Sequence, residues 1–446
     1  MVTLGAAPLP RQYTVDAYDV SIQADLQKQC LYGEARIRLH GLSDTPFSAL
    51  DLDAGGIQVS SVMEGQVAQV FEQDRGKLFV VLAKPLVSGE SRGIVIRYQA
   101  GRLPGIKFSA DQVYTTVTSD WLPVNDRPGE RATLHLTITA PENTKAAASG
   151  RLIAIRSAGG QNVTEWQLDS PTEPYWFGFA LGGFPENTSE EAGVKLRVLG
   201  ADSQVLEPTA AALRYLAERT GKPYPGKMYT QVFVHGDATR AMAGGLALLP
   251  ESYAHKPPAQ PDDLWLLTDE LAQQWYGIGI VPKDWSDLWL SDGISAFLAD
   301  TYLEKRLGKD AYEHEIQRSR QIYNQLRAEG ADRPLSGAEW TTRKEADGEI
   351  PKFKGASFLY LLHLLVGDDA FWNGLRLYTS NEWGQAATSE DLQKAFDAVA
   401  PADRGTEPKR GAARRKKNSK VMATPLDKLF DLWVYGIPEP ATKKSR

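Results

Sequence analysis

Short apolar stretches that alternate with polar residues fill residues 1–200. They include YDVSIQADL, ARIRLHGL, KLFVVLAKPL, GIVIRYQA and ATLHLTITA, with Gly, Pro, Asn or Asp between them. A period of two is typical of strands that bury one face. We therefore expect an N-terminal β domain over 1–200, built as an antiparallel saddle or sandwich, with VKLRVLG (194–200) as its last clear strand.

The apolar period becomes helical after residue 200. Segment 207–221 carries apolar residues at helical spacing and stops at Gly221, with Pro223 beyond it. The sequence therefore predicts an α+β multidomain fold with a mainly α second domain over 201–446. This domain should contain a small sheet around MYTQVFVHG and GLALLP, and further helices over 262–279, 284–307, 309–329 and 353–367.

Composition narrows the class of protein. The chain has 446 residues, of which 42% are apolar, so it is long enough for two or three cores. Its single cysteine, Cys30, excludes an intramolecular disulfide and a cysteine-based metal cluster. No apolar run reaches the ~18 residues that a transmembrane helix needs, so we expect no membrane span.

Charge gives little reason to expect nucleic-acid binding. The chain has 50 basic and 56 acidic residues and a net charge of −6. The segment 408–420, PKRGAARRKKNSK, has seven basic and no acidic residues, but no aromatic side chain that could stack on a base. We expect it to be a solvated basic loop within the second domain.

The N-terminal sequence leaves the cellular location open. MVTLGAAPLPRQYTV lacks the basic segment and the long apolar stretch of a signal peptide. We expect a cytoplasmic protein if Met1 is the true start, and an extracytoplasmic one if a signal peptide is missing upstream.

The stretch TDELAQQWYG carries the residues with the clearest chemical pattern. On a helix, positions 269 and 273 lie one turn apart on the same face, with 270 beside them. Metallopeptidase helices use this spacing for two zinc-binding histidines and a general base. The residues here are Asp269, Glu270 and Gln273, and eighteen residues separate Gln273 from Asp292.

The chain resembles the aminopeptidase N family of zinc peptidases, the gluzincins, over nearly its whole length. Both predicted domains carry the resemblance. The matching segments are YDVSIQADLQKQCLYGEARIRL, KPLVSGE, WLPVNDRPGERATLHLTI and PYWFGFALGGF in the first, and GKPYP (221–225), QQWYG (273–277), DWSDLWLSDGISAFL (284–298), FKGAS (353–357) and LFDLWVYGIP (429–438) in the second. The resemblance implies a thermolysin-like peptidase domain over 201–446, and we expect the family's C-terminal helical domain to be absent.

The resemblance also implies roles for particular positions. The family's zinc-binding pattern, HExxH-x18-E, places Asp269, Gln273 and Asp292 at the three ligand positions and leaves only the base, Glu270, unchanged. Lys352 stands where the family has its catalytic tyrosine. The family's substrate-binding motif corresponds to TRAMAGGLALLP (239–250), where the expected cleft residues Ala243, Gly244, Gly245 and Leu246 include no glutamate to hold a substrate amine.

These departures remove what zinc chemistry needs. Zinc prefers imidazole and thiolate ligands, whereas a carboxylate–amide–carboxylate set is better suited to Mg²⁺, Ca²⁺ or Mn²⁺. Without a metal, no water acidic enough for Glu270 to deprotonate is available. Neighbouring carboxylates repel one another, so we expect them to pair with a cation, for which Lys352 is the candidate. We expect no zinc, with the other divalent ions as the alternative.

Two functions remain open. The first is a non-catalytic pseudopeptidase that serves as a peptide- or protein-binding scaffold, holding an extended peptide on the edge strand around 244–249. The second is an active metallopeptidase with an altered, oxygen-ligand metal site. The sequence does not name the partner.

Overall fold

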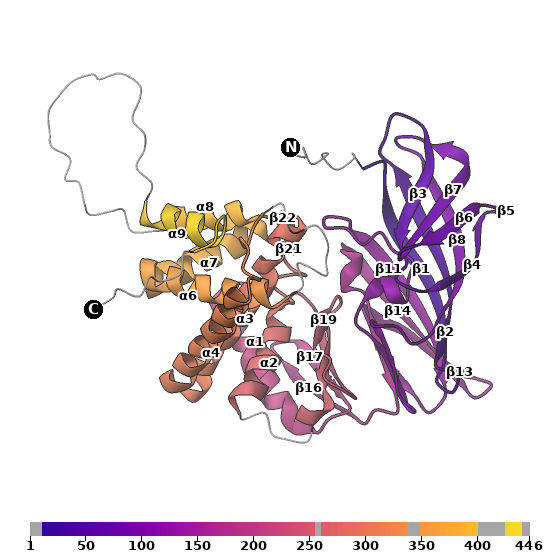
Figure 1. The fold of residues 1–446 in the computed structure, drawn as a ribbon. Coiled ribbons are helices and arrows are strands. Elements are labelled where there is room, and N and C mark those ends of the chain that lie inside the picture. Colours follow the sequence, from indigo (N-terminus) through magenta and orange to yellow (C-terminus); the bar gives the residue numbers. More distant parts are fainter. Residues whose placement is uncertain (1–10, 255–259, 338–339, 341–347, 400–423, 439–446) are drawn as a thin grey trace, which may run out of the picture. The chain divides into compact units, whose positions relative to one another are not determined.

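The computed structural model describes residues 11–254, 260–337, 340, 348–399 and 424–438. The chain forms two compact units, the first from 1–206 and 226–257 and the second from 207–225 and 258–446 (Figure 1). The division expected at residue 200 differs in the segment 226–257, whose first strand pairs with a strand that ends before residue 200. The segment 408–420, expected to be a basic loop, lies outside the described residues.

Eight strands form the largest sheet of the first unit. Buried residues recur at every second position along the central strands, because one face of the sheet packs on the core. All neighbours are antiparallel except β1 and β11, so the predicted antiparallel β fold is confirmed. In sheet order, the strands are β13 (Arg151–Ala158), β14 (Gln161–Thr172), β11 (Ala132–Pro141), β1 (Tyr13–Asp25), β2 (Cys30–Gly41), β8 (Ser91–Ala100), β4 (Gln58–Glu64) and β5 (Val67–Ala68).

Three smaller sheets complete the first unit. A core of buried side chains, including Tyr114, Phe184 and Val232, joins the four-stranded sheet to the five-stranded one. The three-stranded sheet has the order β3 (Phe47–Asp53), β7 (Lys77–Leu86), β6 (Val70–Asp74). The four-stranded sheet has the order β12 (Lys145–Ala148), β15 (Phe179–Gly182), β10 (Gln112–Thr115), β9 (Ile106–Phe108). The five-stranded sheet has the order β16 (Glu186–Glu191), β17 (Val194–Leu199), β18 (Met228–Val234), β20 (Leu246–Pro250), β19 (Arg240–Met242). Short helical turns lie between them: η1 (Thr118–Asp120), η2 (Pro174–Trp176), η3 (Ser203–Val205) and η4 (Glu251–Tyr253).

The second unit is mainly helical, as predicted. Its one small sheet pairs β21 (Val281–Pro282) with β22 (Ala386–Ala387) in parallel. The helices are α1 (Leu206–Thr220), α2 (Pro261–Ala272), α3 (Trp289–Leu307), α4 (Lys309–Ala328), α6 (Gly355–Val366), α7 (Asp368–Glu382), α8 (Ser389–Val399) and α9 (Pro425–Trp433), with a short 3₁₀ turn η5 (Trp285–Asp287) and a π-helical turn η6 (Ile350–Lys354).

One helix is shorter than expected. The apolar pattern predicted a helix over 262–279, but α2 ends at Ala272 and a series of turns follows. Gly277, five residues after the end of α2, has a φ of 130°, outside the helical region, so the helix could not continue through this position to residue 279. Gln273 is therefore the cap residue at the end of α2 rather than a residue inside it.

Two glycines allow η6 to lie against α3. A Cβ on Gly293 would be 2.9 Å from the Cα of Gly355, closer than real side chains approach a backbone. Gly293 follows Asp292 directly, and Gly355 lies three residues after Lys352. The glycine contact therefore brings these two charged positions into the same region of the unit.

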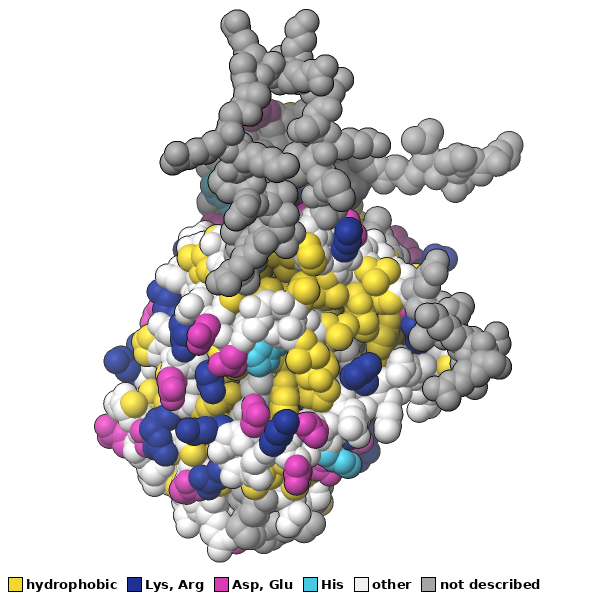
Figure 2. Space-filling view, turned by 90° about the vertical axis from the view of Figure 1, so that its left-hand side faces the viewer, with side chains coloured by type: hydrophobic (Ala, Val, Ile, Leu, Met, Phe, Trp, Pro, Cys, Tyr) yellow, Lys and Arg dark blue, Asp and Glu magenta, His cyan; other side chains and the backbone are white. Residues whose placement is uncertain are grey.

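The apolar helix α6 is only partly covered. Leu364 and Leu365 are 64% and 44% exposed, although neighbouring residues of this helix are fully buried. Figure 2 shows the face of the molecule where hydrophobic side chains gather among charged ones. None of the helices in the described ranges is long and apolar enough to cross a membrane.

Candidate functional site

Helix α2 supplies the central part of the site. It begins with Pro261 in its first turn, where the absent N–H costs nothing, and with acidic residues that suit a helix N-terminus. Asp269 and Glu270 lie in its last turn, and the N–H of Gln273 donates to the carbonyl of Asp269 at 3.2 Å. All three side chains are buried, as is Asp292 in the first turn of α3. The structure therefore places three acidic residues and an amide in the interior of the second unit.

Lys352 provides the cation for this cluster. Its Nζ donates to Asp269 Oδ2 at 2.7 Å and lies 5.4 Å from the ring centre of Trp265. Burial lowers the pKa of Lys352, but the charges of Asp269, Glu270 and Asp292 outweigh that effect and raise it above its ordinary value. The ammonium of Lys352 therefore pairs directly with Asp269 and is further stabilised by the charges of Glu270 and Asp292.

Asp269 is the carboxylate most committed to this ion pair. Asp269 is fully buried, and burial raises the pKa of its carboxyl group. The ammonium of Lys352 opposes that rise. Oδ2 accepts the hydrogen bond from Lys352, whereas Oδ1 has no hydrogen-bond partner among the described residues. Lys352 is therefore the main cation that stabilises the charged form of this buried carboxylate, and the charge of Arg318 adds a smaller contribution.

A second layer of charge surrounds Trp265 and was not predicted from the sequence. Its indole Nε1 donates to Asp300 Oδ1 at 2.7 Å, and the guanidinium of Arg318 lies 5.3 Å from its ring centre. Arg318 also pairs with the buried Glu315. Burial raises the pKa of Asp300 well above its usual range, and the nearby Glu315 raises it further. The sequence contains one indication of this layer, because the charged residue Asp300 interrupts the apolar run ISAFLADTYL.

The expected cleft residues Ala243, Gly244, Gly245 and Leu246 belong to the first unit. Gly244 and Gly245 have φ of 75° and 78°, and a Cβ on Gly244 would meet the backbone of Gly150 at 2.0 Å. The N–H of Ala243 donates to the carbonyl of Trp176 at 2.9 Å. These residues form a tight turn that packs against other backbone of the same unit.

The expected edge strand around 244–249 is wrong. β20 begins at Leu246 and lies between β18, which is parallel to it, and β19, which is antiparallel. The edge strands of this sheet are β16 and β19 instead. The apolar segment 246–250 is typical of an interior strand rather than of an edge strand.

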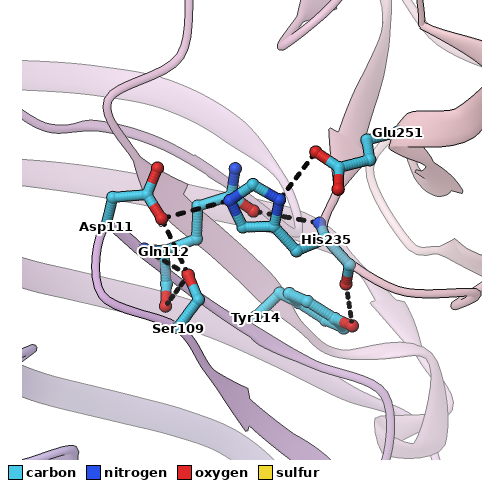
Figure 3. Close-up of polar contacts among 6 residues, drawn as sticks. All are labelled: Ser109, Asp111, Gln112, Tyr114, His235 and Glu251. Atoms are coloured by element: carbon cyan, nitrogen blue, oxygen red, sulfur yellow. Dashed lines mark hydrogen bonds and ion pairs between the residues drawn. The ribbon is translucent and has the colours of Figure 1, made fainter.

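His235, which follows β18, is the centre of a polar cluster in the first unit (Figure 3). Its Nδ1 lies 2.6 Å from Glu251 Oε2 and its Nε2 lies 3.1 Å from Asp111 Oδ1. Its backbone is held as well, because its N–H donates to the side chain of Gln112 and its carbonyl accepts from Tyr114 Oη. Both ring nitrogens face carboxylates, an arrangement that suits a doubly protonated imidazolium.

We expect the stability of the first unit to depend on pH through His235. Hydrogen bonding to Glu251 is the main cause that raises the pKa of His235 above 6.5, so its contribution is complete below that pH and is lost as the pH rises through the raised pKa. Burial raises the pKa of Asp111, but hydrogen bonds from Ser109 and His235 outweigh it and lower the pKa, so the Asp111 contribution is lost only toward strong acid. The His235→Ala variant should therefore unfold at lower urea than the parent near pH ~6 and match it more closely near pH ~9.

The size of this effect should be small. His235 is partly exposed, so the difference in unfolding free energy should stay below about 1 kcal/mol. Urea unfolding of parent and variant across a pH series measures it. A difference that does not change with pH would contradict the imidazolium assignment.

The residues at the three positions where the resemblance predicts zinc ligands do not fit zinc. They offer two carboxylates and a neutral amide in place of imidazole nitrogens, and the ammonium of Lys352 is already bound 2.7 Å from one carboxylate oxygen. A divalent cation there would face a like charge at close range. Within the part of the chain that the structure describes, no group of three or more His, Cys, Asp or Glu side chains is arranged to hold a metal ion.

Comparison with known proteins agrees with this architecture. The model of the peptidase family M1 domain matches residues 205–407. The mouse (Mus musculus) endoplasmic reticulum aminopeptidase 1 is 20% identical over 92% of this chain, and aminopeptidase N of Haemophilus influenzae is 24% identical over 80% of it. The matches cover 48% and 44% of those two proteins, so the chain spans about half the length of the curated relatives it matches.

A solved structure extends the agreement to both units. The M1 zinc metallopeptidase from Deinococcus radiodurans superposes with a TM-score of 0.74 at 23% identity, and the match covers 97% of this chain and 95% of that one. The fold is that of the two-domain M1 metallopeptidases. The matched domain and the curated relatives show that the chain is similar to aminopeptidases of the M1 type.

Proposed function

We propose that this chain is a non-catalytic member of the aminopeptidase N family. One observation carries the proposal: a lysine ammonium is bound to the carboxylate at the first ligand position, 2.7 Å from Asp269. The second position holds Gln273, which has no charge to offer a metal. Glu270 keeps the position of the general base, but a base needs an activated water or substrate beside it.

The function that fits such a chain is binding rather than cleavage. A mutant form of the Deinococcus radiodurans M1 zinc metallopeptidase is described as bound to a Tyr-Ser-Ala substrate, and its fold matches this chain with a TM-score of 0.74. That likeness supports a peptide- or protein-binding scaffold on the same fold. The partner that we propose is a peptide or protein, not a nucleic acid.

Metal content and turnover together test the proposal. We expect the purified full chain to contain substoichiometric zinc and to release no product from a panel of aminoacyl amides. Glu270→Gln is the matched control, because it changes only the retained base and should give the same background rate as the parent. Chelator-sensitive turnover that is present in the parent and lost in this variant would overturn the proposal.

Rebuilding the ligand set gives the complementary result. The combined variant Asp269→His, Gln273→His, Asp292→Glu and Lys352→Tyr restores the family's pattern and removes the resident cation. It should bind one zinc ion per chain, and the parent should not. If the rebuilt chain folds but takes up no zinc, then something other than these side chains determines the absence of metal.

An oxygen-ligand metallopeptidase is the second candidate. The charges of Asp269, Glu270 and Asp292 all raise the pKa of Lys352, although these side chains, as described, form no group arranged to hold a metal ion. Mg²⁺, Ca²⁺ or Mn²⁺ would suit such oxygen ligands if the lysine moved away. Turnover that these ions stimulate in the parent would favour this candidate.

A further inference from the structure

The cluster around Lys352 has the composition of a cation-binding cage with an aromatic wall. Asp269 accepts a hydrogen bond from the ammonium, and Trp265 presents its ring 5.4 Å from the same nitrogen. Trp265 is itself fixed, because its Nε1 donates to the buried Asp300. Both side chains of the cage therefore come from α2, and Trp265 is held in place by Asp300 of α3 independently of Lys352.

We infer that this cage is a primary-ammonium site and that its resident ligand is the side chain of Lys352. The inference rests on the proposed function, in that the cage stands where the family binds zinc. It goes further by assigning the chemical class of ligand that these side chains now select.

The geometry favours ammonium over a divalent metal. An indole ring attracts an ammonium through its face but offers no lone pair with which to coordinate a metal ion. Asp269 Oδ1, fully buried and without a described hydrogen-bond partner, can accept a further N–H but cannot by itself complete a coordination shell. An ammonium with three N–H donors can use both oxygens of Asp269 and the ring face together.

The Lys352 side chain occupies a route by which a soluble amine could reach Asp269. Its side chain is 24% exposed, whereas the Asp269 side chain is 0% exposed. Truncation at Cβ would therefore open a path from solvent to the buried carboxylate. The removed atoms correspond to n-propylammonium, so this ion is the matched probe.

Thermal unfolding of the full chain tests the inference. Lys352→Ala should melt several degrees below the parent, and millimolar n-propylammonium should recover about half or more of that loss by binding the folded state. The melting temperature of the parent should not respond. Neither 1-propanol nor potassium chloride at equal ionic strength should replace the amine, and Mg²⁺, Ca²⁺ and Mn²⁺ should recover less than the amine does.

Two further variants serve as controls. Lys394→Ala removes an exposed lysine that pairs with Glu390 and Asp391 on α8, and its melting temperature should not respond to the amine. Lys352→Ala combined with Asp269→Asn should lose the amine response, because the accepting charge is gone. Recovery by divalent ions but not by the amine, or an equal response in the parent, would overturn the inference.

A measurement on the parent chain covers the case in which Lys352→Ala does not fold. Reductive methylation followed by mass spectrometry should modify Lys394 at least ~10-fold faster than Lys352, because a caged ammonium rarely becomes a reactive amine. Equal rates would contradict the cage. Failure of either test leaves the zinc and turnover assays unaffected, so the ammonium site and the non-catalytic function can fail separately.

Discussion

Replacing Lys354 with Met is expected to lower the unfolding free energy of the second unit by about 3–5 kcal/mol. The Lys354 side chain is fully buried, and its Nζ donates to Asp332 Oδ1 at 2.9 Å and to the backbone carbonyls of Arg333 and Gly436. One ammonium therefore connects η6, the loop after α4 and the segment after α9. Methionine fills the volume but leaves Asp332 Oδ1 and two carbonyls without the donor that Lys354 provides, while Tyr323 and Arg327 still contact Asp332 Oδ2.

Urea unfolding of the variant gives the energy, and hydrogen exchange shows where it is lost. We expect faster exchange around residues 332–336 and 434–438, since Lys354 contacts both segments. Combining Lys354→Met with Asp332→Asn should recover part of the loss, because the neutral amide still accepts the hydrogen bond from Tyr323. If the single variant were as stable as the parent, this ion pair would have no structural role.

Replacing Gly293 with Val is expected to cost about 3 kcal/mol and to disturb the ammonium cage. A Cβ at this position would meet the Cα of Gly355 at 2.9 Å and the carbonyl oxygen of Pro351 at 3.3 Å. These atoms are backbone, so α3 and η6 must separate to make room. Lys352 lies on η6, and its ion pair with Asp269 should weaken as the turn moves.

Two measurements check this expectation. Urea unfolding should show the loss of stability, and methylation of Lys352 should become faster than in the parent. Gly93→Val is the control, because a Cβ at Gly93 in β8 meets nothing within 4 Å. A Gly293→Val chain with unchanged stability and unchanged Lys352 reactivity would show that the glycine contact does not position η6.

Much of the candidate site could be predicted because it depends on local spacing. Positions 269, 270 and 273 occupy one turn at the end of a helix, and a period of 3.6 residues determines which of them share a face. The opposite charge of Lys352 made it a candidate partner for the carboxylates, and the structure contains that ion pair. Charge alone could not show which lysine of η6 reaches the cluster, because Lys354 carries the same charge and pairs with Asp332 instead.

The contacts that were missed join segments distant in sequence. Asp300 and Trp265 are 35 residues apart, and His235 and Asp111 are 124 apart. The edge position of β19 was missed for the same reason, because strand order depends on pairing between strands that a periodic pattern does not reveal. The sequence pattern also did not reveal that α2 ends at Ala272 and is followed by turns, including Gly277 with its non-helical φ of 130°.

The sequence alone determined the order of strands and helices, the helical face that carries Asp269 and Glu270, and the absence of histidine from positions 269 and 273. These follow from hydrophobic periodicity and residue chemistry, which act over one or two turns. The tertiary structure decided which cation neutralises the carboxylates, which ring covers that cation and which strand forms the edge of a sheet. Those outcomes depend on close packing between distant segments, as in the contact of Gly293 with Gly355, which local patterns do not specify.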